Sequence, residues 1–401
     1  MKRILSLFQP SPVRGSYADA GDFLRVACVG FIGWFHIWQQ SWLNPNLVLG
    51  RHVVRFYPLV ACGYMFVDLM LALSGFLLML GWLSGRSRDL RGFYTARAAR
   101  ILPSYWLCLA IMLFGFALPG NLYNGSSKHM WTDILAHLSF THNLFPYSYS
   151  YTHLNGALWT LAVEVQFYLI FPLLARLFER RPGYTYAGMV CVALLSRALM
   201  ATRLEDTTFY VNRLSAMLDV YANGMLAAWA YHKLRRAPVS AARAWLNTAL
   251  TIISAVLVCK ILNVQLSNTG GEVLRHGQML WRFPLSALGC VFLLCGSRSI
   301  RLLRALFSNR ITRFLSGISF NFYIWHQFLA VKLKEWHIPP SVGETPNYDY
   351  AQPWQSHYTL ACFAAALGAA ILITYAVERP CARWIKRRFG GAKPLESRRG
   401  A

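Results

Sequence analysis

Two histidines and two carboxylates stand deep inside apolar stretches of the sequence. They are His36, Asp68, Glu164 and His326. Each lies about 9–14 residues from one end of its stretch, or roughly 14–21 Å at about 1.5 Å per residue. An ionisable group this deep in a membrane is costly unless it is paired or faces water, so each is a functional candidate. An imidazole can act as a general base or nucleophile and a carboxylate can orient it, so we expect the four to form a catalytic group if their helices are neighbours.

Each candidate also has a structural interpretation. Glu164 could pair with a neighbouring arginine, and Tyr168, four residues later on a helix, could donate to its carboxylate. His326 could be a buried histidine that makes a single hydrogen bond. Ser74 precedes Gly75 in a small-residue step suited to helix packing, without the GxSxG context of a hydrolase nucleophile. The residue types alone leave both interpretations open.

Three arginines could bind an anion close to these candidates. Arg25 and His36 are eleven residues apart, which is three helical turns, so they share one helix face with about 16 Å between their levels. Arg97 and Arg100 are three residues apart on one face and could grip a phosphate with paired N–H donors. The alternative for all three is a positive charge that anchors a helix at the cytoplasmic face.

Other cofactor signatures are missing from the sequence. It has no Gly-rich dinucleotide or ATP-binding loop and no HExxH zinc motif. The nine cysteines lie in or beside apolar runs without a CxxC pair, which speaks against a zinc site and a disulfide framework. We therefore expect no metal.

The elements that position these residues must be membrane helices. Of the 401 residues, 56% are hydrophobic and only 14% are charged, which excludes an ordinary soluble protein. A helix needs about 20 apolar residues to cross a hydrocarbon layer of about 30 Å, and we predict an all-α, polytopic fold of about ten transmembrane helices. Segment 131–147, which carries Asp133, His137 and His142, is only semi-apolar and is predicted to be interfacial or re-entrant. The predicted spans are 22–43, 59–83, 98–118, 153–176, 184–200, 214–234, 244–263, 281–297, 314–336 and 355–378.

The charge distribution predicts how these helices are oriented. The chain carries 40 Lys and Arg against 16 Asp and Glu, a net charge of +24. With the N-terminus inside, 28 of the basic residues fall on the inner side and about nine on the other, as the positive-inside rule requires. The basicity is therefore topological, and nucleic-acid binding is not expected. We predict a cytoplasmic segment at 1–21 with no cleaved signal, a transmembrane domain at 22–378 and a basic cytoplasmic tail at 379–401.

Six motifs follow one another along the chain. They are Asp22…Arg25-x10-His36, VDLMLALSGFLL at 67–78, FYTARAARILPSYW at 93–106, LWTLAVEVQFYLIFPLL at 158–174, SGISFNFYIWH at 316–326 and YAVERP at 375–380. Together they resemble the bacterial acyltransferase-3 family of integral membrane O-acyltransferases, from about residue 20 to 385. The resemblance implies ten spans, a cytoplasmic acyl-CoA donor and a hydroxyl acceptor on a glycan or another exported molecule. It matches Arg25 and His36 to the family's arginine-to-histidine motif, and Arg97 with Arg100 to its paired-arginine motif. Because only about 23 residues follow 378, the stand-alone form without an SGNH domain is expected.

The residues and the resemblance lead to one functional hypothesis. A multi-pass protein of the bacterial cytoplasmic membrane moves an acyl group, expected to be acetyl, from cytoplasmic acyl-CoA to a hydroxyl of a glycan, a lipid-linked sugar or a related acceptor. His36, Glu164, Asp68 and His326 would be catalytic, and Arg25, Arg97 and Arg100 would bind the donor. A proton-coupled transporter or flippase is the alternative, since mid-membrane carboxylates and histidines also form proton relays. A non-catalytic membrane scaffold is the third possibility.

Overall fold

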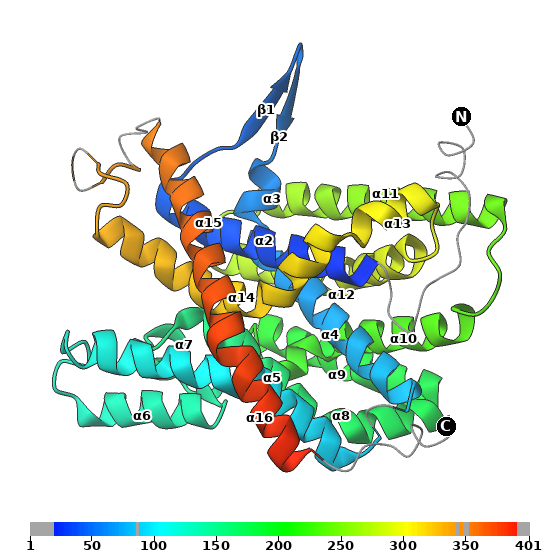
Figure 1. Ribbon diagram of the computed structural model, residues 1–401, viewed down its shortest axis with the longest axis horizontal. Helices are drawn as coiled ribbons and strands as arrows, with labels where there is room; N and C mark the ends of the chain where they lie inside the picture. Colours follow the sequence, from blue (N-terminus) through cyan, green and yellow to red (C-terminus); the bar gives the residue numbers. More distant parts are fainter. Residues whose placement is uncertain (1–19, 86–87, 342, 344, 348–352, 391–401) are drawn as a thin grey trace.

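The computed structural model describes residues 20–85, 88–341, 343, 345–347 and 353–390, and within them the chain forms ten long helical stretches (Figure 1). The expected segment 1–21 therefore lies almost wholly outside the described residues. Each of the ten predicted spans corresponds to one of these stretches. They are α2 (Ala20–Ser41), α4 (Phe66–Leu83), α5 (Leu90–Ala110), α8 (Trp159–Arg180), α9 (Pro182–Arg203), α10 (Leu218–Leu234), α11 (Ala241–Leu266), α12 (Gly271–Gly296), α14 (Arg310–Glu335) and α15 (Trp354–Ile373).

Two of the stretches are continued by π-helical turns. The turn Ile111–Ala117 extends α5, and the turn Thr374–Glu378 joins α15 to α16 (Arg379–Phe389). Residues 379–389, which we expected to belong to a basic tail, thus continue the last helix. Residues 391–401 of that tail lie outside the described residues.

The helices confirm a polytopic all-α membrane fold. Among the described residues, eight stretches are long and apolar enough to cross a membrane. The other two predicted spans correspond to α10 and α14. Helix α10 has 17 residues, and α14 carries polar side chains such as Asn321 and His326 in its middle. Both lie inside the bundle, since α10 packs along α4 and α14 packs along α2 and α15. Neighbouring helices therefore shield the polar side chains of α10 and α14 from lipid.

The contact between α4 and α10 is close because glycines stand where the backbones meet. A Cβ atom on Gly224 would lie 2.1 Å from the carbonyl oxygen of Ala72, and one on Gly75 would lie 2.7 Å from that of Tyr221. No larger side chain fits at either place. The small-residue step at Ser74 and Gly75 therefore does permit close helix packing, as predicted.

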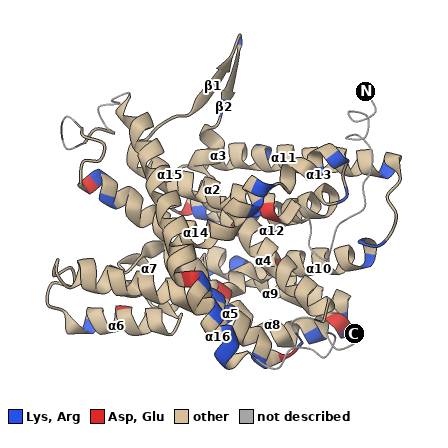
Figure 2. Ribbon diagram, viewed as in Figure 1, with Lys and Arg blue, Asp and Glu red and all other residues tan. Residues whose placement is uncertain are grey.

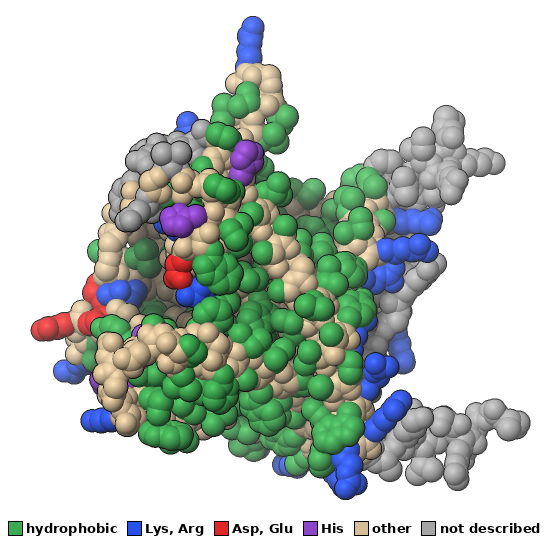
Figure 3. Space-filling model, turned by 60° about the vertical axis from the view of Figure 1, so that its left-hand side comes forward, with side chains coloured by type: hydrophobic (Ala, Val, Ile, Leu, Met, Phe, Trp, Pro, Cys, Tyr) green, Lys and Arg blue, Asp and Glu red, His purple; other side chains and the backbone are tan. Residues whose placement is uncertain are grey.

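The connections between helices lie at two ends of the molecule (Figure 1). Basic residues gather at the end that holds the α4–α5, α8–α9 and α10–α11 connections, which we call the basic end (Figure 2). The space-filling view shows exposed basic side chains along this end (Figure 3). They include Arg88, Arg180, Arg181, Lys233 and Arg236. The other end, which we call the opposite end, holds the segments 42–62, 118–158 and 204–213.

Segment 118–158 does not cross the bundle. It leaves the last turn of α5 and returns to α8, and it contains α6 (Ser127–Leu138) and α7 (Pro146–Ser150). A β-hairpin at the same end was not predicted. Strands β1 (Asn46–Leu49) and β2 (His52–Arg55) pair antiparallel with Leu49 opposite His52, so the turn is Gly50–Arg51, with Gly50 at a φ of +61°. Two short apolar runs around a Gly-containing turn are a hairpin signal. A helix, α3 (Tyr57–Ala61), leads from the hairpin toward α4.

Candidate active site

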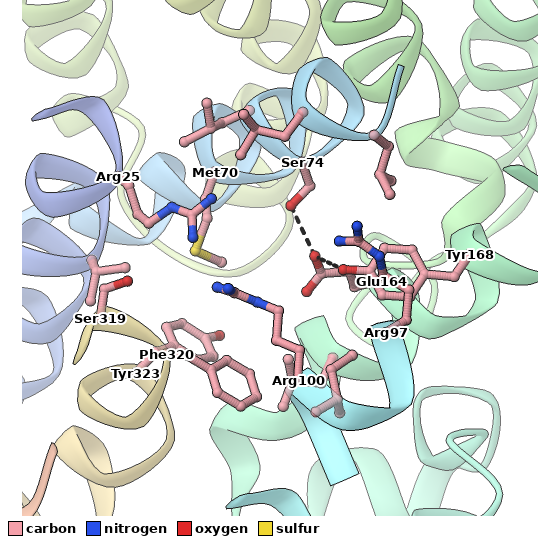
Figure 4. A pocket seen from close by; sticks show the side chains of 16 residues that line it. Arg25, Met70, Ser74, Arg97, Arg100, Glu164, Tyr168, Ser319, Phe320 and Tyr323 are labelled. Carbon is pink, nitrogen blue, oxygen red and sulfur yellow. Dashed lines mark hydrogen bonds between the residues drawn. The ribbon is translucent and has the colours of Figure 1, made fainter. Parts of the chain in front are cut away.

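A cavity of about 260 Å³ lies between α2, α4, α5, α8 and α14 (Figure 4). Its charged lining is three arginines and one glutamate, supplied by three different helices. The remaining lining includes apolar side chains of α4 such as Met70 and Leu77. The polar side chains that line it are Arg25, Ser74, Arg97, Arg100, Glu164, Tyr168, Ser319 and Tyr323.

Two hydroxyl groups hold the carboxylate of Glu164 on one side of this cavity. Ser74 Oγ on α4 donates to Glu164 Oε1 at 2.9 Å, and the Tyr168 hydroxyl donates to the same oxygen (Figure 4). The contact with Tyr168 follows from the four-residue spacing on α8. Ser74 was assigned to packing alone from the sequence, because nothing in α4 indicates which side chain of α8 it faces.

The arginines face the same space. The side chain of Asp89 caps α5 by accepting from Gly92 N at 2.8 Å, which places Arg97 about 12 Å along the helix from its start. The Arg97 guanidinium carbon lies 5.6 Å from the ring centroid of Phe93 and 5.7 Å from that of Tyr168. Its Nε is buried with no hydrogen-bond partner. Ring contacts hold a guanidinium without using its N–H donors, so these donors remain available to a ligand.

Arg100 and Arg25 complete a site suited to an anion. The guanidinium of Arg100 lies 5.7 Å from the ring centroid of Phe320, and in Figure 4 the side chains of Arg25 and Arg100 point toward the middle of the cavity. Three guanidinium groups face one carboxylate, so the lining carries a positive excess. Guanidinium groups bind phosphate with paired N–H donors. The residues present therefore fit a ligand that carries a phosphate group.

His36 and His326 lie against one another, with ring centroids 5.1 Å apart. They come from α2 and α14, which pack closely because Gly33 stands at the contact. A Cβ atom at position 33 would lie 2.7 Å from Cε1 of Phe322 and 3.8 Å from Cδ2 of His326. His36 is half-buried, whereas His326 is only 1% exposed. The structure thus brings the two imidazoles together, and we call them the imidazole pair.

Hydrogen bonds restrict the tautomers of this pair. His326 Nδ1 lies 2.6 Å from the carbonyl oxygen of Tyr323, which can only accept, so Nδ1 carries the proton. In the neutral ring His326 Nε2 is then a lone-pair acceptor, and it is buried without a partner. His36 Nδ1 lies 3.0 Å from Gln39 Oε1 on the next turn of α2. Sequence reasoning missed Gln39, although its three-residue spacing from His36 is a usable signal.

The wall of the cavity leads toward the imidazole pair. Tyr323 lines the cavity, and its ring centroid lies 5.5 Å from that of His326. Its hydroxyl donates to Ala157 O at 3.0 Å and accepts from Thr160 Oγ1 at 2.7 Å. Arg25 and His36 lie on the same continuous helix, about 16 Å apart in level. One face of α2 therefore runs from the arginines to the imidazoles.

Asp68 does not share this chamber, contrary to our expectation for the four buried residues. It is 1% exposed, and its Oδ1 accepts from Arg282 Nε on α12 at 3.1 Å. Asp68 precedes Met70 by two residues and Ser74 by six, or roughly 200° and 240° around a helix, so it faces away from the cavity. The position of Asp68 deep within an apolar stretch correctly marked it as buried. The sequence did not show which neighbouring helix its side chain faces. Glu164 likewise contacts Ser74 and Tyr168 rather than an imidazole.

A second polar cluster is buried at the opposite end, in the segment predicted to be interfacial or re-entrant. The rings of His137 and His142 stack with centroids 4.0 Å apart. His137 Nδ1 lies 3.2 Å from Asp133 Oδ1, and Asp133 Oδ2 accepts from Tyr123 and Thr152 at 3.0 Å each. Burial is the main reason that the pKa of His142 is lowered to about 3, and its neighbour His137 adds to the shift.

The chain matches a protein family and is similar to several known proteins. Residues 20–375 match the protein family described as "Acyltransferase domain". The chain is 27% identical to Nodulation protein 10 of Rhizobium leguminosarum bv. viciae, over 58% of this chain and 65% of that protein. It is 24% identical to Peptidoglycan O-acetyltransferase OatA of Listeria monocytogenes, over 66% of this chain and 44% of that protein. Acyltransferase MdmB of Streptomyces mycarofaciens is 24% identical over 88% of both chains.

The match covers only part of some relatives. The chain spans just under two thirds of the nodulation protein and less than half of the peptidoglycan O-acetyltransferase. No solved structure matches the chain significantly.

Proposed function

We propose that this chain, which belongs to the acyltransferase-domain family, transfers an acyl group from acyl-CoA to a hydroxyl group of a glycan or a related acceptor. The observation that carries the proposal is the arrangement of two sites along α2. One is a cavity with three arginines, and the other is the imidazole pair two to three turns farther along the helix. A phosphate-bearing donor and a general base are what such a reaction requires.

The donor is proposed to bind from the basic end. By the positive-inside rule we assign that end to the cytoplasmic side of a bacterial inner membrane, and acyl-CoA is present in the cytoplasm. The cavity of about 260 Å³ is smaller than the roughly 300–1,000 Å³ of typical ligand sites, so it would hold only part of the donor. Arg97, Arg100 and Arg25 would bind its phosphates, and the thioester arm would extend toward His36.

The imidazole pair is proposed to carry out the proton transfer. An imidazole takes the proton of the acceptor hydroxyl while the oxygen attacks the thioester carbonyl carbon. An ester C–O bond forms, the C–S bond breaks, and the proton passes from the imidazole to the leaving thiolate. A positioned base typically contributes about 10²–10⁴-fold. We assign the base to His36, because it is partly exposed, and a hydrogen-bond acceptor role to Nε2 of the buried His326.

The acceptor is proposed to approach from the opposite end. His36 lies five residues before the end of α2 at Ser41, and Gln39 beside it is exposed. Figure 3, which turns this end forward, shows a hollow with charged and histidine side chains at its rim. One relative is named for O-acetyl transfer to peptidoglycan. For this chain we propose that the acceptor is a hydroxyl group on an extracytoplasmic glycan. We propose that the transferred acyl group is acetyl.

The test uses purified protein in nanodiscs with radiolabelled acetyl-CoA and a crude glycan acceptor. His36→Ala should lose at least 100-fold in rate, whereas His357→Ala, at an exposed position on α15, should not. Arg97→Ala with Arg100→Ala should raise the apparent KM for acetyl-CoA more than tenfold. Transfer retained by His36→Ala would remove this residue from the chemistry. A protein that moves a solute with a proton gradient and transfers no label would be a transporter instead.

A further inference from the structure

The loop between α9 and α10 presents an arginine in an unusual setting at the opposite end. The guanidinium carbon of Arg213 lies 4.5 Å from the ring centroid of Phe209 and 4.4 Å from that of Tyr210. Its Nε is buried and has no hydrogen-bond partner. Two aromatic rings thus hold this guanidinium in place. Its buried Nε–H group lacks the hydrogen-bond acceptor that buried polar groups normally have.

No carboxylate of the described chain pairs with Arg213. Asp219, the acid nearest to Arg213 in sequence, forms an ion pair with Arg197. Asp206 and Glu272 both form ion pairs with Arg275. Glu272 also accepts from Thr207 N at 3.0 Å and from its hydroxyl at 2.7 Å. The local acids are therefore already engaged, and Arg213 keeps an uncompensated positive charge. This setting is complementary to an anion.

The loop that carries Arg213 is fixed by hydrogen bonds from Arg282, a buried arginine of the helix bundle. Arg282 on α12, which is fully buried, donates to Val211 O and, at 2.6 Å, to Asn212 Oδ1. Its third contact is the ion pair with Asp68. Asn212 in turn donates to the Tyr149 hydroxyl on α7 at 2.9 Å. The residue adjoining Arg213 is thus tied to two other elements, and a preorganised site loses little entropy when it binds a ligand.

Aromatic side chains beside Arg213 complete the surface. The rings of Tyr149 and Phe209 lie 5.9 Å apart, and Tyr149, Phe209 and Tyr210 are all half-buried. A partly exposed aromatic ring offers a flat face to the C–H groups of a sugar ring. A guanidinium offers two parallel N–H donors to a carboxylate or a phosphate. Together they provide what recognition of an acidic sugar requires.

We propose that Arg213, with Phe209, Tyr210 and Tyr149, is a binding subsite for an oxyanion carried on the acceptor saccharide. This inference rests on the proposed function and narrows it, because it assigns the acceptor to the acidic glycans. The oxyanion can be the carboxylate of a uronic acid or a phosphate on a sugar, and both present the same oxygen geometry to the guanidinium.

The experiment measures transfer from acetyl-CoA to three sets of oligosaccharides of equal length. One set contains uronic acids, the second is the same material with its carboxyls reduced to alcohols, and the third is phosphorylated. The wild type should show a lower apparent KM for an acidic set than for the reduced set. Arg213→Ala should raise that KM by about 10- to 100-fold and change the KM for the reduced set less than twofold. Whichever acidic set shows the effect identifies the oxyanion.

Two further variants separate recognition from folding of the loop. Arg213→Lys keeps the charge but loses the paired donors, so it should fall between the wild type and Arg213→Ala. Arg203→Ala removes an exposed arginine at the same end of the molecule and should leave every KM unchanged. Saturation-transfer NMR of the acidic oligosaccharide on wild type and Arg213→Ala should show binding to the wild type alone, and it needs no turnover.

The inference would be wrong if Arg213→Ala used the acidic sets as well as the wild type does, or if the wild type preferred the reduced set. Either result leaves acyl transfer itself intact. If no acceptor became labelled at all, the proposed function would fail, while NMR would still report whether Arg213 binds an acidic sugar.

Discussion

At the scale of single residues, the structure changes which groups set the state of the imidazoles. The sequence led us to expect Glu164 or Asp68 to orient a histidine. Instead, His326 donates to the backbone carbonyl of Tyr323 and His36 lies within hydrogen-bond distance of the Gln39 side chain. A neutral partner fixes the tautomer without adding the charge stabilisation that a carboxylate gives to an imidazolium. The base is therefore positioned more than it is activated.

This arrangement makes Gln39 a positioning residue. We predict that Gln39→Leu lowers kcat by about tenfold, the value of one hydrogen bond of about 1.4 kcal/mol, and leaves the KM for acetyl-CoA unchanged. The conservative variant Gln39→Glu should retain activity and shift the pH–rate profile to higher pH, because a carboxylate stabilises the imidazolium. Steady-state kinetics measured as a function of pH reports both effects.

The matched control is Gln40→Leu, the neighbouring glutamine on the same helix. It points about 100° away and should leave kcat and the pH profile as they are in the wild type. Equal kinetics of Gln39→Leu and the wild type would show that the tautomer of His36 is set by another group.

Residue types and spacing predicted the candidates better than their partners. Arg25, Arg97 and Arg100 line the cavity, and His36 meets His326. Spacing along one helix defines a shared face, which is why these groupings could be anticipated. It does not define which helix that face meets, so the contact of Ser74 with Glu164 and the pairing of Asp68 with Arg282 could not be.

At the scale of elements, apolar length was the strongest signal. Each predicted span corresponds to a long helix, because the cost of unsatisfied backbone groups in lipid leaves the chain few alternatives. The β-hairpin at 46–55 was missed because it lies outside the spans, where no such constraint applies. The π-helical turns in the extension of α5 and after α15 give no sequence signal that we can identify.

The segment 127–150 is predicted to open in acid. The pKa of His142 is lowered from 6.5 to about 3 by burial, so the folded segment favours the neutral ring. This contribution to stability is fully present above pH 6.5 and is lost as the pH falls from 6.5 toward 3, because only the opened state takes up the proton. At pH 5 the loss is about 2 kcal/mol, from about 1.4 kcal/mol per pH unit.

Hydrogen exchange of peptides from α6 and α7, corrected for the intrinsic pH dependence, measures this opening. Protection should fall by about 30-fold between pH 7 and pH 5 in the wild type. His142→Gln should be less protected at pH 7 and nearly independent of pH. Lys128→Gln, at an exposed position of α6, should behave like the wild type. A pH dependence that survives in His142→Gln would assign the opening to another group.

At the scale of the whole molecule, the two proposed half-sites are offset along the bundle. The arginines of α5 lie within the first three turns from the basic end, whereas His36 lies in the last two turns of α2 before the opposite end. The buried Tyr323 stands between them. An enzyme built this way should take its donor from one side of the membrane and acylate its acceptor on the other.

Sealed membrane vesicles of both orientations test this asymmetry, since acetyl-CoA does not cross a bilayer. In the proposed orientation the basic end faces the medium in inverted vesicles. External acetyl-CoA should then label a glycan trapped in the lumen and leave the same glycan in the medium unlabelled. In right-side-out vesicles, external acetyl-CoA should label neither. Detergent abolishes the sidedness, and both preparations should then reach the same rate, which controls for the amount of active enzyme. Labelling by external acetyl-CoA in sealed right-side-out vesicles would contradict the assignment of the arginine cavity to the cytoplasmic side, because the donor would then have reached the chemistry from the end where Arg213 and Gln39 lie.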